Sequence, residues 1–209
     1  MPRRSGARTS ARKEEIIGAC AALYETMSFR DITLKEISEY TSFSRPSIYN
    51  YFQTKEEIFL ALLQREYELW IEDLYGITAA RTSMTTEELA DVLAGSLERR
   101  ARLLKLMSMN HFDMEENSRL ERLTEFKAAY GGSLRAVERI LEKFCPAMPA
   151  ADRQSFLYMF FPFIYGIYPY AAVSEKQREA MEQAGTGFAY HSIYELTFPF
   201  IKKLLATYP

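Results

Sequence analysis

Two helix-start motifs stand 21 residues apart near the N-terminus of this chain, and they limit what its first quarter can fold into. Thr33-Leu-Lys-Glu36 and Thr54-Lys-Glu-Glu57 both follow the capping-box pattern. In that pattern a Thr hydroxyl and a Glu carboxylate three residues later satisfy free backbone N–H groups at a helix start. Apolar residues at helical spacing follow, as in Leu34 and Ile37 after the first motif. The interval between the motifs has room for one further short helix.

The stretch SRPSIYNYF, residues 44–52, supplies that helix. Ser44 is a suitable N-cap, and a proline is tolerated in the first turn because its missing N–H would have no partner there. At 100° per residue Ile48 and Phe52 share one face, which we expect to be buried. The outward face then carries hydrogen-bonding, aromatic and cationic groups: Arg45, Pro46, Ser47, Tyr49 and Asn50.

Helical periodicity dominates the remaining sequence, and strand signals are nearly absent. A first helix is expected over residues 10–27, a long one from Thr54, and later ones over 85–107, 118–144, 151–173 and 188–207. Prolines break the chain near residues 145–149, and residues 174–187 form a polar, partly helical connector. The sequence therefore predicts an all-α protein.

Charge is unevenly distributed along the chain. The whole sequence has a net charge of −2, but residues 1–13 carry five basic residues and no acidic one: Arg3, Arg4, Arg8, Arg12 and Lys13. Residues 1–55 hold nine basic and six acidic residues, a charge of +3, so the other 154 residues carry −5. Such a basic arm can add non-specific affinity for DNA or enter a minor groove. A tail without a role is the alternative.

Cysteine content and hydropathy argue against secreted and membrane proteins. Cys20 and Cys145 are too few for a disulfide framework or a cysteine-rich metal site. The basic start lacks the apolar stretch of a signal peptide, so we expect a reducing cytoplasm. Residues 156–173 are free of charge, but they are interrupted by prolines and sit at the lower length limit of a membrane span. A buried helix or a helix–helix interface is favoured there.

An enzyme is also disfavoured. The two histidines, His111 and His191, are not spaced as metal ligands. The sequence has no glycine-rich phosphate loop and no convincing nucleophile with a base. We therefore expect no catalytic residues, metal or cofactor.

Residues 32–63, ITLKEISEYTSFSRPSIYNYFQTKEEIFLALL, combine these features into a helix-turn-helix. A capped helix, the short turn Thr41-Ser42-Phe43 and a second short helix with an exposed polar face define that motif. The stretch resembles the tetracycline-repressor (TetR) family of bacterial regulators in its Thr cap, its aromatic-rich second helix and its Lys-Glu-Glu opening of the next helix. The resemblance covers about the first 65 residues, and only length and helical character agree beyond them.

The turn departs from the family pattern, which usually has glycine where this chain has Ser42. A serine in the left-handed conformation would cost on the order of 1 kcal/mol. We expect Phe43, larger than the usual valine, to compensate by packing into the core.

The resemblance implies that residues 1–56 form a DNA-binding domain. The second helix of such a motif enters the major groove, where Arg45 suits guanine, Pro46 a thymine methyl group, and Asn50 an adenine or a phosphate. Tyr49 and Tyr51 are expected to contact phosphates or sugars, although one of the two could instead be half-buried. The expected DNA contacts are Thr33, Lys35, Ser44, Arg45, Pro46, Ser47, Tyr49, Asn50, Tyr51 and Lys55.

The resemblance also implies that residues 57–209 form a helical domain for effector binding and dimerisation. The last two helices, FLYMFFPFIYGIYPYAAV and SIYELTFPFIKKLL, are apolar enough to pair with a second subunit. The middle helices are expected to enclose a small apolar or aromatic effector, although ordinary core packing is the alternative for each candidate. The candidate lining residues are Tyr67, Trp70, Met107, His111, Phe112, Phe126 and Tyr130.

The predicted function is that of a homodimeric transcriptional regulator in a bacterial cytoplasm. It would bind a palindromic operator in double-stranded DNA and be released by its effector, with repression the commoner outcome in the family. The alternative is a helix-turn-helix protein without ligand response, acting constitutively or architecturally.

Overall fold

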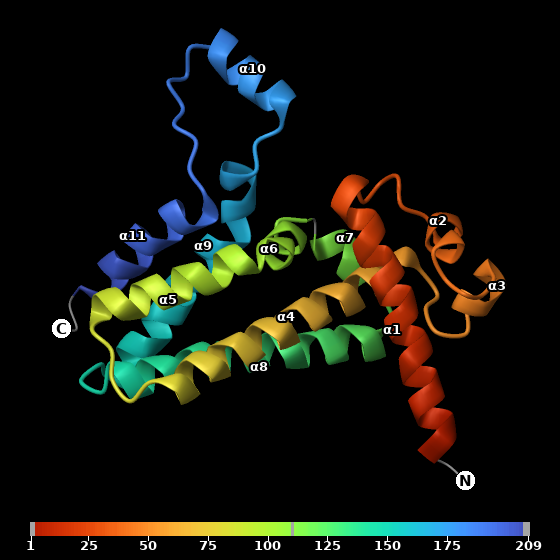
Figure 1. The fold of residues 1–209 in the computed structure, drawn as a ribbon, viewed down its shortest axis with the longest axis horizontal. Helices are drawn as coiled ribbons and strands as arrows, with labels where there is room; N and C mark the ends of the chain where they lie inside the picture. The colour runs from red at the N-terminus through yellow and green to blue at the C-terminus, as the bar shows by residue number, and fades with distance from the viewer. Residues whose placement is uncertain (1–2, 110, 207–209) are drawn as a thin grey trace. The chain divides into compact units, whose positions relative to one another are not determined.

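A computed structural model describes residues 3–109 and 111–206, with side chains from Thr9 onward. These residues form eleven helices and no strand, which confirms the all-α prediction (Figure 1). The helices belong to two compact units. The first unit contains the described residues of 1–65 and 110–129, and the second contains those of 66–109 and 130–209. The predicted division after residue 56 falls inside a helix that both units share, and its functional meaning stays a prediction.

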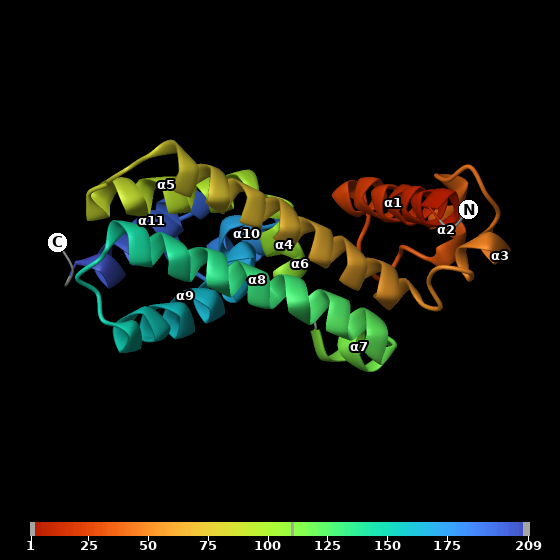
Figure 2. The ribbon, with the colours of Figure 1, turned by 90° about the horizontal axis from the view of Figure 1, so that it is seen from below.

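The first unit holds the N-terminal helices, in which α2 packs against α1 and α3 (Figure 2). Its core contains apolar residues at helical spacing that are fully buried, among them Ile16 and Cys20 of α1, Ile37 of α2 and Ile48 of α3. Its helices are α1 (Arg3–Thr26), α2 (Leu34–Glu39), α3 (Arg45–Ile48), the start of α4 (Lys55–Ala80), α7 (His111–Glu116) and the start of α8 (Leu120–Phe144).

The second unit holds the rest of α4 and α8 and the C-terminal helices. Within it α11 packs against α5 and α9 (Figure 1). The side chain of Trp70 is fully buried at its centre, where its indole N–H donates to Ser96 Oγ at 3.1 Å. The additional helices are α5 (Thr86–Arg99), α6 (Ala101–Met107), α9 (Ala150–Ala171), α10 (Glu175–Gln183) and α11 (Ile193–Leu205).

Capping residues set the starts of several helices. The capping box at Thr33 is formed as predicted, and others are formed at Thr85, Ser174 and Ser192. The motif at Thr54 is different: its hydroxyl accepts the Glu57 N–H at 3.2 Å, but the Glu57 carboxylate turns to the N–H of Gln53. The Glu57 carboxylate can therefore accept hydrogen bonds from other parts of the first unit.

The helices of the structure differ from the predicted ones in several places. The helix expected over residues 85–107 breaks at Arg100, whose φ and ψ are −106° and 38°, because its guanidinium turns to Asp73 and to the carbonyl of Leu69. The short helix α7 was not predicted. The last helix begins at Ile193 rather than at 188, after the Ser192 cap.

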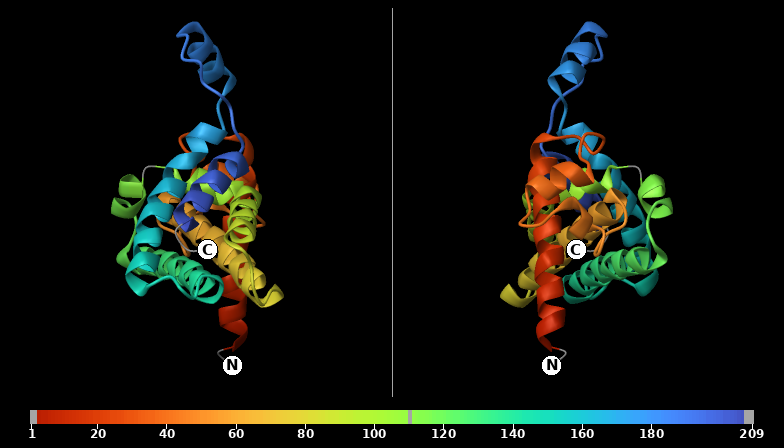
Figure 3. Two further views of the ribbon diagram at one scale, coloured as in Figure 1. Left: turned by 90° about the vertical axis from the view of Figure 1, so that its left-hand side faces the viewer. Right: turned by 90° about the vertical axis from the view of Figure 1, so that its right-hand side faces the viewer.

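Helix α10 stands away from the other helices of the second unit (Figures 1 and 3). It has no buried residue. Among the described residues no single helix is both long and apolar enough to cross a membrane. Helices α9 and α10 meet those criteria only as a pair, which is bent by 83°.

Candidate nucleic-acid interface

Helix α3 is a short helix anchored to the core by apolar side chains on its buried face. Ile48 and Phe52 are buried, as the face assignment predicted. Ser44 has the extended backbone of an N-cap and Pro46 lies in the first turn. The Ser44 side chain makes no capping hydrogen bond within the described residues, and its hydroxyl lies 3.2 Å from that of Ser47. Proline and packing, rather than a side-chain cap, therefore hold the start of this helix.

The opposite face of α3 is open. Arg45, Pro46, Tyr49 and Asn50 are exposed, and Ser47 is half-buried. The Arg45 guanidinium donates to the Tyr49 hydroxyl at 3.1 Å and lies 5.9 Å from the centre of its ring. This contact holds the cationic group along the helix surface, where less rotamer entropy is lost on binding a base edge.

Tyr51 is half-buried, which is the alternative stated for one of the two tyrosines. Arg12 donates to its hydroxyl at 3.3 Å and lies 5.9 Å from the ring centre of Phe43. Phe43 is half-buried, so the expectation that it packs into the core is corrected. The side chains of Arg3, Arg4 and Arg8 lie outside the described residues, although α1 begins at Arg3.

The turn between α2 and α3 is built without a left-handed serine. Among the described residues only glycines have positive φ, so the expected strain at Ser42 is absent. The Ser42 N–H instead donates to the carboxylate of Glu15 on α1. Hydrogen bonds from the Ser42 backbone and hydroxyl lower the pKa of Glu15. The sequence offered no signal for this contact, because 27 residues separate the two positions.

The expected contacts outside α3 have different surroundings. Thr33 and Lys35 are exposed at the start of α2, where Lys35 lies 3.9 Å from Glu39. Lys55 is turned inward: its ammonium donates to the carbonyls of Phe29 and Ile32 at 2.8 and 3.2 Å. Because these bonds and the Phe29 ring occupy the ammonium, we leave Lys55 out of the proposed DNA surface.

The seven candidate effector residues are divided between the units. His111, Phe112 and Phe126 belong to the first, where His111 stacks on Phe126 and Phe112 is 85% exposed. Tyr67, Trp70, Met107 and Tyr130 belong to the second.

Tyrosine and phenylalanine rings form a cluster in the second unit. Tyr67 is fully buried, and its hydroxyl lies 2.9 Å from that of Tyr165. Burial and the neighbouring Tyr165 raise the pKa of Tyr67, so the Tyr67 hydroxyl is neutral at pH 7. Tyr130 packs edge-on against Tyr67 and Phe161.

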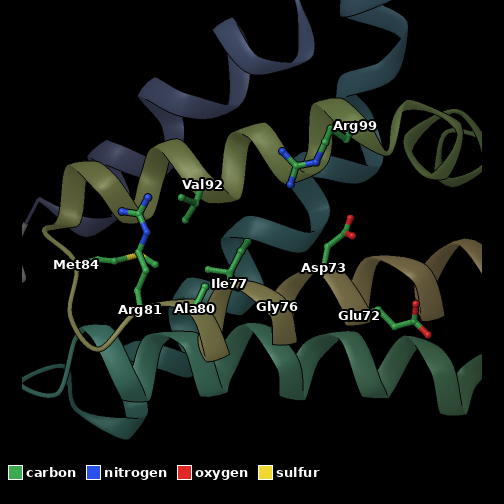
Figure 4. Close-up of a pocket in the computed structure, with 9 residues that line it drawn as sticks. All are labelled: Glu72, Asp73, Gly76, Ile77, Ala80, Arg81, Met84, Val92 and Arg99. Atoms are coloured by element: carbon green, nitrogen blue, oxygen red, sulfur yellow. The ribbon is translucent and has the colours of Figure 1, made fainter.

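Two hollows in the second unit differ in chemistry. One, of about 690 Å³, lies between α8 and α9, with an aromatic wall that includes Tyr130, Tyr158 and Phe161. The other, of about 450 Å³, lies between α4 and α5 (Figure 4). Its charged residues are Glu72, Asp73, Arg81 and Arg99, and the rest of its lining is Gly76, Ile77, Ala80, Met84 and Val92. The first hollow suits an apolar or aromatic group better than the second.

Two family profiles together match most of the chain. A profile of "Bacterial regulatory proteins, tetR family" matches residues 16–62. A profile of the "Tetracyclin repressor-like, C-terminal domain" matches residues 64–191. A comparison with curated proteins found no match.

Solved structures share the fold at low sequence identity. A TetR/AcrR-family transcriptional regulator from Thermobifida fusca is 18% identical, with a TM-score of 0.63, covering 95% of this chain and 99% of its own. The fatty acid degradation regulator FadR from Bacillus halodurans is 14% identical, with a TM-score of 0.60 and coverages of 93% and 94%. The repressor AlkX from Dietzia, implicated in n-alkane biodegradation, is 13% identical, with a TM-score of 0.50 and coverages of 91% and 95%.

Proposed function

This chain belongs to the TetR family of bacterial regulatory proteins, and we propose that it is a homodimeric repressor that an effector releases from a palindromic DNA operator. Family members are DNA-binding regulators and not enzymes, and this chain carries their helix-turn-helix. Repression, dimerisation and effector release are the parts of the function that we propose.

The exposed face of α3 carries the proposal. Arg45, Pro46, Tyr49 and Asn50 point away from a buried anchor formed by Ile48 and Phe52. Arginine and asparagine can each make bidentate hydrogen bonds to base edges in the major groove. We propose that these residues read the operator, with Thr33, Lys35, Ser44, Ser47 and Tyr51 contacting the backbone or neighbouring bases.

Dimerisation is proposed through α9 and α11. Tyr158, Met159 and Tyr170 of α9 are exposed by 74%, 49% and 59%. Phe163 of α9 stacks on Phe200 of α11 at 3.7 Å, and both rings remain half-exposed. A second copy would cover this apolar surface and supply two recognition helices, as a palindrome requires.

The effector is proposed to be small and apolar or aromatic. The rings around Tyr130 in the second unit support this choice. FadR and AlkX are named for fatty acid degradation and n-alkane biodegradation, so fatty acids and alkanes are sensible first compounds for screening. Release follows if the effector favours a conformation that holds the recognition helices at the wrong spacing.

Selection of binding sites from random duplex DNA tests the proposal. The wild-type protein should enrich a palindromic consensus, and a Tyr49→Ala/Asn50→Ala variant should lose it. Tyr75→Ala is the matched control, because Tyr75 is exposed to a similar extent (43% against 46%) but lies on α4 in the second unit.

Two results would contradict this assignment. Equal enrichment by the double variant would place sequence recognition outside α3. Binding without any consensus would support the constitutive or architectural alternative.

A further inference from the structure

A fully buried carboxylate, that of Glu57, is hydrogen-bonded to the chain that follows helix α3. Glu57 stands in the first turn of α4 and is 0% exposed. One of its oxygens accepts the N–H of Gln53 at 2.8 Å and Arg119 Nη2 at 2.8 Å. The other accepts Arg119 Nε at 2.6 Å and the Arg119 backbone N–H at 3.2 Å. Four hydrogen bonds therefore hold this carboxylate in one orientation.

The same residues contact the end of the SRPSIYNYF segment. Arg119 Nη2 also reaches the Tyr51 carbonyl at 3.4 Å, and the Thr54 hydroxyl donates to the Asn117 carbonyl at 3.0 Å. The guanidinium of Arg122 lies 5.7 Å from the ring centre of Phe52. Residues 117–122, which comprise the connection from α7 to α8 and the first turn of α8, thus contact residues 51–54 at several points.

The chemistry of this contact favours a role in geometry over one in stability. The Glu57 carboxylate is fully buried while the Arg119 side chain is 38% exposed, and the cost of desolvating the carboxylate offsets much of the attraction between the two charges. The planar guanidinium fork, however, fixes distance and angle together. Burial disfavours the charged form of Glu57, but hydrogen bonds from Arg119 and Gln53 outweigh it and lower its pKa. The pair therefore stays ionised at neutral pH.

We propose that Arg119 is a positioning residue for operator recognition: through Glu57 it fixes the end of the recognition segment, residues 44–52. This inference rests on the proposed function.

Two variants test the role of Arg119. Arg119→Lys keeps the charge but cannot bind both carboxylate oxygens as a fork. Glu57→Gln/Arg119→Gln removes both charges, so it leaves no buried charge unpaired if the lysine variant fails to fold. Each should bind the operator selected by wild type about tenfold more weakly or worse, the size of one lost base contact, and random duplex DNA as wild type does.

Arg100→Lys is the matched control. Arg100 forms the same arrangement in the second unit, with a fork to Asp73 at 2.7 and 2.8 Å and a bond to the Leu69 carbonyl at 3.1 Å. It touches no residue of the recognition segment, so this variant should bind both DNAs as wild type does.

Amide hydrogen exchange without DNA separates this inference from the proposed function. The Gln53 N–H depends on Glu57, so its exchange should be faster in both Arg119 variants and unchanged in Arg100→Lys. Faster exchange with wild-type operator affinity would overturn the positioning role, as would an equal loss of operator and random-DNA binding. If wild type selects no operator, the proposed function fails. Unchanged Gln53 exchange would overturn the inference in its own right.

Discussion

At the scale of single residues, the helix-turn-helix depends on contacts between residues far apart in sequence. Ser42 occupies a turn position where glycine is usual, yet it needs no left-handed backbone because Glu15 accepts its N–H. Ile48 and Phe52 could be assigned to the core from spacing alone. The surroundings of Phe43 and Lys55 could not, because the Arg12 guanidinium beside Phe43 comes from α1 and the carbonyls that bind Lys55 come from the chain that follows α1.

The Ser42→Gly substitution tests whether this turn is strained. With an ordinary backbone at Ser42, glycine should lower the free energy of unfolding by about 0.4–1 kcal/mol by adding freedom to the unfolded chain. A strained, left-handed serine would give the opposite sign, by about 1 kcal/mol. Urea unfolding of the two proteins followed by circular dichroism distinguishes these outcomes. A more stable glycine variant would contradict the absence of strain.

Lys55 and Lys35 should separate stability from DNA binding. Lys55→Met leaves the Phe29 and Ile32 carbonyls without their charged donor, so the free energy of unfolding should fall by about 1–3 kcal/mol. Lys35→Met removes the charge of an exposed side chain, so it should leave stability nearly unchanged while weakening operator binding. Urea unfolding and operator titration of both variants check the pair. Weaker binding by fully folded Lys55→Met would return Lys55 to the DNA surface.

At the scale of helices, the sequence predicts starts better than interruptions. Thr33 was readable as a cap because the motif is local, whereas the same pattern at Thr54 forms only the hydroxyl half of the predicted capping box. The break at Arg100 was not readable, since helical propensity continues across it and the partners of its guanidinium lie on α4, about 30 residues earlier. Helix α7 is only six residues long, too short for a periodic signal.

Two capping residues should differ in their importance to stability. Thr33→Ala removes the cap of a six-residue helix that buries Leu34 and Ile37, so the free energy of unfolding should fall by about 1 kcal/mol. Ser174→Ala removes the same type of cap from α10, which has no buried residue, so global stability should not change. Urea unfolding of both variants measures the difference. Equal losses would mean that α10 folds together with the core.

At the scale of the whole molecule, the sequence predicts two helical parts but not their membership. Residues 110–129 join the first unit although about 45 residues separate them from the end of its N-terminal stretch. No local sequence pattern predicts that Arg119 pairs with Glu57, because tertiary packing brings together partners that are 62 positions apart. The exposed face of residues 45–50 was readable because these residues are close in sequence, and their contact with DNA stays a prediction.

We expect whether the protein is a monomer or a dimer to depend on whether a second copy covers the exposed side chains of α9. Eight large apolar or aromatic side chains are exposed among the described residues, and three of them belong to this helix: Tyr158, Met159 and Tyr170. A stable dimer needs about 1,200–2,000 Å² of buried surface with an apolar centre, and α9 with α11 offers such a centre. A charge placed there would be desolvated without a partner. Met159→Glu should therefore turn a dimer into a monomer in sedimentation velocity at micromolar concentration.

The matched control places the same charge on an exposed apolar side chain elsewhere. Phe112, 85% exposed on α7 in the first unit, should tolerate Phe112→Glu without change in sedimentation. Because a palindrome is bound by two recognition helices at once, the Met159→Glu monomer should also lose most of its operator affinity while its α3 is unchanged. A monomeric wild type would contradict the proposed dimer. A Met159→Glu variant that remains dimeric would show that the subunit interface lies elsewhere than on α9.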